Sequence, residues 1–188
     1  MSWSIRWKIA AGTLAAVACG LLIAGWMTVQ ALEQRHLTQF GETLEAKAKL
    51  VEYGFLALFE SSTLSVTPSR LQEIARDLGI RSSARITLIA SDGTILADNA
   101  VRDVDIPTLE NHASRTEVTQ AFATGQGQDV RPSHTTGERT MYHARLLRVP
   151  HDRPPWVVRV ALPLAQVDRL SDELKRQLLL AIGVAFLL

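Results

Sequence analysis

Residues 86–98 read ITLIASDGTILAD, and this stretch decides the fold. Two short apolar runs, 85–90 and 94–98, lie on either side of the turn residues Ser91, Asp92 and Gly93. Asp-Gly between such runs is a strong hairpin signal, because both residues tolerate the positive φ values of tight turns. The stretch therefore predicts two antiparallel strands joined by a short turn.

Two later segments, 140–147 and 156–162, alternate in the manner of strands of the same sheet. We expect residues 151–155 to form the loop that joins them. The alternation places Tyr142, Ala144 and Leu146 on one face of the first segment and Met141, His143 and Arg145 on the other.

Two short helices are predicted by their end signals. Thr67 is suited to be an N-cap with Pro68 at the first helical position, and Gly79 to end that helix. Ser114 and Glu117 have capping-box spacing, so they predict a second helix that ends at Gly125.

A longer helix over 37–59 carries leucine and valine at seven-residue intervals. Such a stripe needs a partner surface. It can pack on the sheet of its own domain or on a second copy in a dimer, and both can hold at different heights. The stripe consists of Leu37, Leu44, Val51 and Leu58.

Both ends of the chain are apolar. Ile9 to Leu32 runs for about 24 residues without a charge, which is about 36 Å of helix and enough to cross a bilayer. A second apolar run, 178–188, is half as long and is interpreted as the start of a second span. Arg6 and Lys8 favour a cytoplasmic N-terminus. The alternative is a cleaved signal peptide, since Val29-Gln30-Ala31 resembles a cleavage site.

The middle of the chain is nearly neutral, since residues 33–176 hold all 19 acidic residues and 18 of the 20 Lys and Arg. This balance argues against a nucleic-acid partner. Cys19 is the sole cysteine, so no intrachain disulfide forms. We expect a two-pass protein of the inner or plasma membrane with residues 33–177 extracytoplasmic. The expected divisions are the cytoplasmic N-terminus (1–8), first span (9–32), juxtamembrane or dimer helix (33–66), sensor domain (67–163), exit helix (164–177) and the start of a second span (178–188).

The predicted order is a long helix, a short helix, a hairpin, another helix, two or three strands and an exit helix. This order indicates an α+β domain of PAS-like or Cache-like type, in which helices cover an antiparallel sheet and enclose a ligand-sized pocket.

One segment resembles a known family. Residues 86–98, followed by Leu109-Glu110-Asn111-His112 and Arg115-Thr116-Glu117-Val118, resemble the extracytoplasmic domain of phosphate-regulon-type (PhoR-like) sensor histidine kinases. The chain departs from that pattern at Leu109, Asn99 and Thr116, where the family has Met, Ser and Pro.

The resemblance implies a homodimeric, two-pass kinase of a two-component system. Such a kinase uses ATP and Mg²⁺ to phosphorylate a cytoplasmic histidine and passes the phosphoryl group to a response regulator. None of those catalytic parts matches this chain, so no catalytic residue and no cofactor is assigned to it. The alternatives are the sensor of a chemoreceptor or diguanylate cyclase, and a membrane-anchored binding protein without a signalling role.

The candidate ligand-binding residues are His112, Arg115, Asn111 and Asp98. His112 and Arg115 stand near a predicted helix N-terminus, where they can donate to an anion or another small ligand. The alternative is structural: Asn111 and His112 satisfy backbone groups, and Arg115 pairs with an acid such as Asp98. The histidines show no ligand spacing, so no metal site is assigned.

Overall fold

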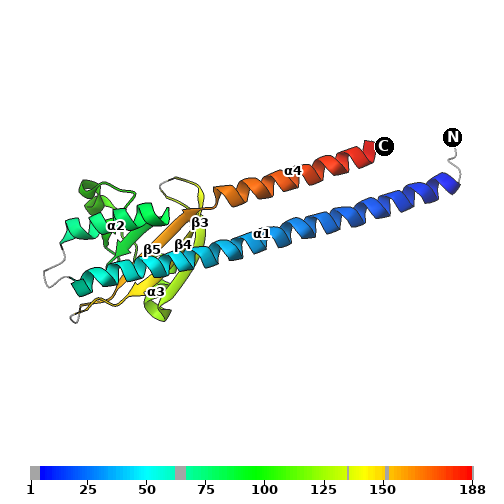
Figure 1. The fold of residues 1–188 in the computed structure, drawn as a ribbon. Coiled ribbons are helices and arrows are strands. Elements are labelled where there is room, and N and C mark those ends of the chain that lie inside the picture. Colours follow the sequence, from blue (N-terminus) through cyan, green and yellow to red (C-terminus); the bar gives the residue numbers. More distant parts are fainter. Residues whose placement is uncertain (1–4, 62–66, 135, 151–152, 188) are drawn as a thin grey trace. The chain divides into compact units, whose positions relative to one another are not determined.

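The computed structural model describes residues 5–61, 67–134, 136–150 and 153–187. It has the α+β architecture expected from the sequence (Figure 1). The elements are α1 (Ile5–Ser61), α2 (Pro68–Ser82), β1 (Arg85–Ile89), β2 (Ile95–Asp98), the 3₁₀ helix η1 (Asp103–Thr108), α3 (Thr116–Thr124), β3 (Gln126–Pro132), β4 (Arg139–Leu147), β5 (Trp156–Pro163) and α4 (Ala165–Leu187).

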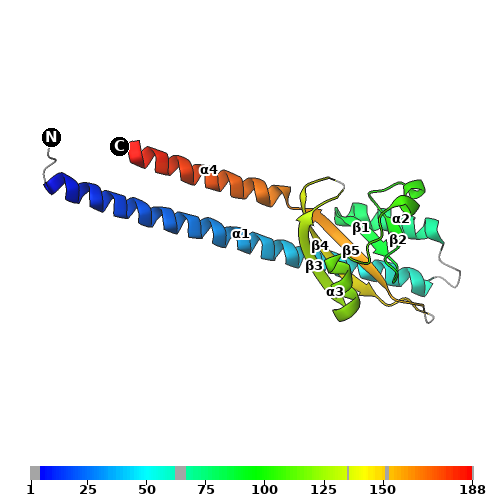
Figure 2. The same ribbon diagram turned by 180° about the vertical axis from the view of Figure 1, so that it is seen from behind.

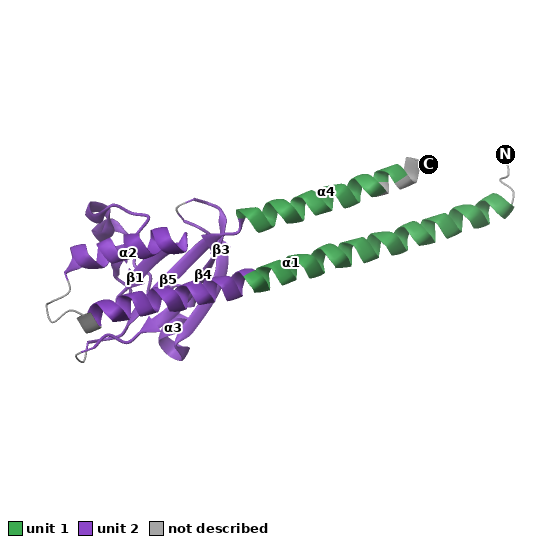
Figure 3. Cartoon of the chain, viewed as in Figure 1, with its two compact units in different colours: residues 1–39, 165–188 green, residues 40–164 purple. Residues whose placement is uncertain are grey.

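The chain forms two compact units, residues 40–164 and residues 1–39 with 165–188 (Figure 3). The unit of residues 40–164 takes in the C-terminal part of α1. Within the unit of residues 1–39 and 165–188, Nζ of Lys175 on α4 lies 3.6 Å from the carboxylate of Glu33 on α1.

One helix among the described residues is long and apolar enough to cross a membrane, by length and composition. It is Ile5–Phe59, whose most apolar window has a mean hydropathy of 2.0 and is not buried. A signal sequence near an N-terminus meets the same criteria of length and apolar composition. Residues 178–187 form the last part of α4, and the second span stays a prediction.

The sheet has the strand order β2-β1-β5-β4-β3, and every neighbouring pair is antiparallel. The predicted hairpin is β1–β2, with Gly93 at φ 85° in its turn. The edge strand β3 carries the polar sequence QGQDVRP, which has no apolar alternation, so the sequence did not single it out.

The start of α2 is confirmed and its predicted end is wrong. Thr67 is the N-cap and accepts a hydrogen bond from the backbone N–H of Arg70 at 3.4 Å. The helix continues past Gly79 to Ser82, and Ser83 takes the left-handed cap conformation at φ 49°. Gly79 is needed for another reason: a Cβ there would lie 1.8 Å from Nδ2 of Asn99.

Helices cover both faces of the sheet (Figures 1 and 2). Helix α3 packs on β3, β4 and β5, with Val118 and Ala121 against Ala144. Helix α1 lies on the opposite face, where Glu52 pairs with Arg145 of β4 and Phe59 meets Trp156 of β5 edge-to-face at 5.6 Å.

The heptad stripe of α1 is divided between the two units. Leu44 and Val51 are fully buried and Leu58 is 7% exposed, all within residues 40–164. These three side chains therefore pack in their own domain, and the assignment of them to a dimer contact needs correction. Leu37 is half-buried in the other unit. Leu50 and Tyr53 are large apolar side chains that are exposed on this part of α1.

Candidate functional site

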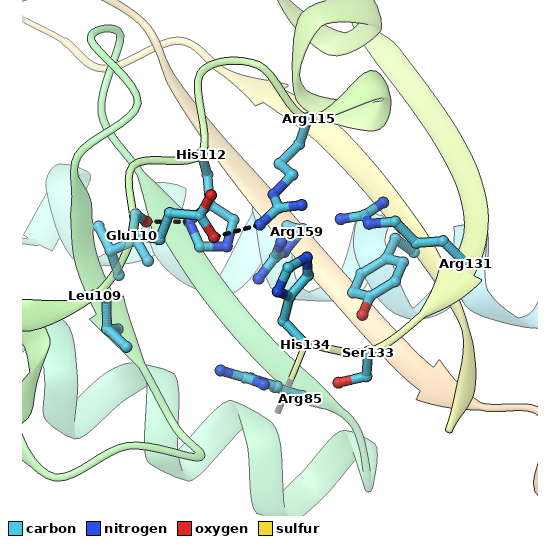
Figure 4. Close-up of a pocket in the computed structure, with 11 residues that line it drawn as sticks. Arg85, Leu109, Glu110, His112, Arg115, Arg131, Ser133, His134 and Arg159 are labelled. Carbon is cyan, nitrogen blue, oxygen red and sulfur yellow. Dashed lines mark hydrogen bonds and ion pairs between the residues drawn. The ribbon is translucent and has the colours of Figure 1, made fainter. Parts of the chain in front are cut away.

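A cavity of about 120 Å³ opens on the α3 side of the sheet (Figure 4). All five strands or the loops beside them contribute to it, so segments far apart in the sequence build one site. Its lining residues are Arg85, Ile95, Leu109, Glu110, His112, Arg115, Arg131, Ser133, His134, Tyr142 and Arg159.

Arg159 is the most buried of the four arginines at this cavity. It lies on the central strand β5, paired in register with Thr87 of β1 and Ala144 of β4, and is 3% exposed. Its Nη2 donates to the Thr87 hydroxyl at 3.0 Å. Because paired residues of adjacent strands face the same side, this register aims the guanidinium at the cavity.

Two fully buried carboxylates hold the arginines. Asp98 accepts from Nε and Nη2 of Arg85 at 3.0–3.2 Å and from the Thr87 hydroxyl at 2.9 Å. Glu117 accepts from both terminal nitrogens of Arg131 at 2.7 and 2.9 Å, and from Arg159 at 3.4 Å. Burial would raise the pKa of Glu117, but the hydrogen bonds from Arg131 and the charge of Arg159 hold it below its ordinary value.

The aromatic ring of Tyr142 also holds two of the arginines in place. The guanidinium of Arg131 lies over the Tyr142 ring, 4.1 Å from its centroid, and that of Arg159 is 5.2 Å away. Arg131 also pairs with Asp129 at 2.7 Å. Stacking and bidentate pairing fix the orientation of a planar guanidinium, so these cations are positioned before any ligand arrives.

The segment before α3 forms the outer wall of the cavity. Arg115 donates to Glu110 at 2.7 Å, and Nδ1 of His112 lies 2.7 Å from the Glu110 carbonyl oxygen. Burial lowers the pKa of His112 to about 4, with a further contribution from the charge of Arg159. His112 is therefore neutral at physiological pH. Because a carbonyl oxygen only accepts, Nδ1 carries the proton and Nε2 is left as a hydrogen-bond acceptor.

Two buried donors at the cavity have no hydrogen-bond partner among the described residues: Nε of Arg115 and Nε of Arg159. An unpaired buried N–H is unfavourable by about 1–3 kcal/mol, so such atoms call for a physical reason. An oxyanion in the cavity would supply acceptors for arginines of this kind. The arrangement is suited to binding an anionic group.

The structure divides the predicted site residues into two groups. His112 and Arg115 line the cavity. Asn111 serves its own loop: it donates to the Asp92 carbonyl at 2.9 Å and accepts from the Ala113 N–H at 2.8 Å. Asp98 is buried and pairs with Arg85, while Arg115 pairs with Glu110.

The predicted capping box is also wrong in its roles. Arg115 is the N-cap of α3 and makes no side-chain cap bond. Glu117 turns inward to the arginines, because a carboxylate there neutralises two cations that are otherwise buried.

Sequence reasoning missed Arg85, Arg131, Tyr142 and Arg159. A signal was present for the last of these: Arg159 interrupts the apolar strand WVVRVALP, and a charge at an inward position of a central strand indicates a function or a buried partner.

No protein-family model matches the chain, and no curated protein matches it in sequence. Solved structures are similar to it in fold. The ligand-binding domain of the Campylobacter jejuni chemoreceptor Tlp3, in complex with L-norvaline, is 12% identical, with a TM-score of 0.56 over 83% of this chain and 63% of that chain. The ligand-binding domain of Mlp24 with asparagine is 12% identical, with a TM-score of 0.55 over 81% and 62%.

The sensor domain of the V. cholerae histidine kinase DctB is 19% identical, with a TM-score of 0.49 over 74% of this chain and 59% of that chain. A TM-score of 0.49 is too low to establish a common fold. The chain spans less than two thirds of the length of each of these three structures. The Tlp3 and Mlp24 domains show that the fold is of the PAS-like and Cache-like type.

Proposed function

We propose that this chain is the sensor region of a membrane receptor and that its cavity binds a small molecule through an acidic group. The observation that carries the proposal is the convergence of Arg85, Arg115, Arg131 and Arg159 on one cavity, where two of their N–H groups have no hydrogen-bond partner in the described part of the chain. Their carboxylate partners lie beneath or beside them, so guanidinium groups form much of the polar surface that a ligand would meet.

The ligand class follows from charge and size. A cavity of about 120 Å³ has room for a small organic acid rather than for a nucleotide. The structures of similar fold include a domain in complex with L-norvaline and one with asparagine. The proposed ligand is therefore an amino acid or a carboxylic acid of similar size, with its carboxylate on Arg115 and Arg159.

The proposed output is kinase control in a two-component system, since the segment 86–118 resembles PhoR-like sensors. A chemoreceptor output is the alternative, because Tlp3 shares the fold. In either case, residues 33–177 would lie outside the cytoplasm and α1 and α4 would carry the signal to the membrane. A shift of α4 by about 1–2 Å is typical of such helical switches.

The ligand proposal is tested with a receptor chimera that joins residues 1–188 to the cytoplasmic half of a sensor kinase with a known reporter gene. The twenty L-amino acids and small carboxylic acids are added singly to cells. We expect a response to at least one compound, and Arg115→Gln to raise the half-maximal concentration by about 10–100-fold, the equivalent of one charge-assisted hydrogen bond.

Arg70→Gln is the matched control, because Arg70 is exposed and pairs with Glu73 on α2, away from the cavity. If Arg115→Gln leaves the dose response unchanged, the ligand does not bind in this cavity. No response to any compound, in a chimera shown to reach the membrane, would count against the small-acid ligand.

The proposed receptor is a homodimer, and the contact residues on α1 are revised. Leu50 is 63% exposed and Tyr53 is 68% exposed, whereas Val51 is buried. We expect cysteines at positions 50 and 53 to form crosslinks between copies in membranes and a cysteine at position 51 to form none. Equal crosslinking at all three positions would indicate random collision and not a defined dimer.

A further inference from the structure

A buried histidine lies on the face of the sheet opposite the cavity. His143 of β4 is 4% exposed, and neither of its ring nitrogens has a hydrogen-bond partner among the described residues. A neutral imidazole has one donor and one acceptor, and leaving both unpaired in a dry contact is unfavourable by about 1–3 kcal/mol each. An alkyl side chain would fill this position at lower energy, so the imidazole needs another reason to be there.

The surroundings place this ring in the contact between α1 and the sheet. Glu45 and Lys49 of α1 act on it electrostatically and pair with each other at 2.7 Å, and Arg145 of β4 pairs with Glu52 of α1 at 2.5 Å. The residues beside His143 in register, Gln128 of β3 and Val160 of β5, are uncharged. One carboxylate near the ring, Glu45, is already paired with Lys49, and Arg145 adds a second cation.

A proton is therefore poorly accommodated while α1 is packed. Burial lowers the pKa of His143, Glu45 opposes the shift, and Arg145 and Lys49 add to it. With α1 released, the ring returns to a pKa near 6.5. A group whose pKa is lowered in the packed state stabilises that state above pH 6.5, and this contribution is lost as the pH falls below 6.5.

We propose that His143 makes the α1–sheet contact sensitive to acid, so that proton uptake on its ring loosens α1 from β4. This goes beyond the ligand site, because His143 and the cavity lie on opposite faces of β4. The chain would then have two inputs: a small acid on one face and the proton concentration on the other. Both would reach α1, the helix that continues into the N-terminal apolar segment.

The test is hydrogen–deuterium exchange of the full chain in detergent micelles at pH 7.5 and pH 5.5, with rates corrected for the intrinsic effect of pH. We expect peptides from residues 44–55 of α1 to lose protection by at least 5-fold at pH 5.5, while peptides of β1 and β5 keep theirs. His143→Leu should abolish most of the loss in α1, because leucine fills the site without titrating.

His36→Gln is the matched control, since His36 also lies on α1 but outside the unit that contains the sheet. It should leave the wild-type pH response intact. If His143→Leu does not fold, NMR titration of the wild-type His143 ring decides: a midpoint below 6.5 that coincides with loss of α1 protection supports the proposal.

Three results would overturn it. They are an α1 whose protection is the same at both pH values, a His143→Leu variant with the wild-type pH response, and a loss of protection spread evenly over the sheet. None of these bears on ligand binding in the cavity, so the two proposals fail separately.

Discussion

The two faces of the sheet are built from alternate residues of the same strands, yet they are opposite in chemistry. Toward α3, β5 presents Arg159 and β4 presents Tyr142, in a network of arginines and buried carboxylates. Toward α1, the same strands present Val158, Val160 and Met141, all buried. The period of two in a strand lets one sheet serve as a binding site on one side and as a helix-packing surface on the other.

This arrangement gives a short path between ligand and helix. Tyr142 touches the arginines of the cavity, and the next residue, His143, lies in the contact with α1. Arg145, two residues further, pairs with Glu52 of α1. A ligand that moved β4 by a fraction of an ångström would therefore act on α1 through adjacent residues of one strand.

The largest effect is expected from Glu117→Gln on the cavity face. Glu117 is fully buried and neutralises Arg131 and Arg159, so an amide there leaves buried guanidinium charge uncompensated. We expect the free energy of unfolding of residues 40–164 to fall by about 3–5 kcal/mol. Urea unfolding followed by the fluorescence of Trp156, which packs on Phe59, measures this loss.

Asp129→Asn is the matched control, because Asp129 pairs with Arg131 but is 25% exposed. Its effect should be below about 1 kcal/mol. Equal losses for the two variants would show that Glu117 is not the main counter-charge of the arginines, and the cavity would then not be held in shape from beneath.

The sequence predicted the locally determined features of the fold better than the contacts between distant polar residues. The Asp-Gly turn, the two faces of β4 and the cap at Thr67 follow from local rules of conformation, and the structure confirms them. The end of α2 and the start of α3 were misplaced, because Gly79 and Glu117 are fixed by distant partners, Asn99 and the arginines of β3 and β5.

The site itself was only partly predictable for the same reason. His112 and Arg115 stand out because they fall in one short segment near a helix start. Arg85, Arg131 and Arg159 come from three separate strands, and only the sheet order and register bring them together. Arg131, Arg85 and Arg159 lie 16, 30 and 44 residues from Arg115 in the sequence. Their convergence is a property of the fold, and no local pattern in the sequence specifies it.

A smaller effect than that of Glu117→Gln is expected from the same substitution on the other face, Glu52→Gln. Glu52 pairs with Arg145 at 2.5 Å, but the two side chains are 17% and 21% exposed, so water can solvate Arg145 when the charge is removed. We expect a loss of about 1 kcal/mol by the same urea measurement. The ratio of the two Glu→Gln effects compares the faces directly: similar values would mean that the α1 contact depends on its ion pair as strongly as the cavity does. A small value would show instead that apolar packing holds α1, which leaves His143 as the buried group in that contact through which pH can act.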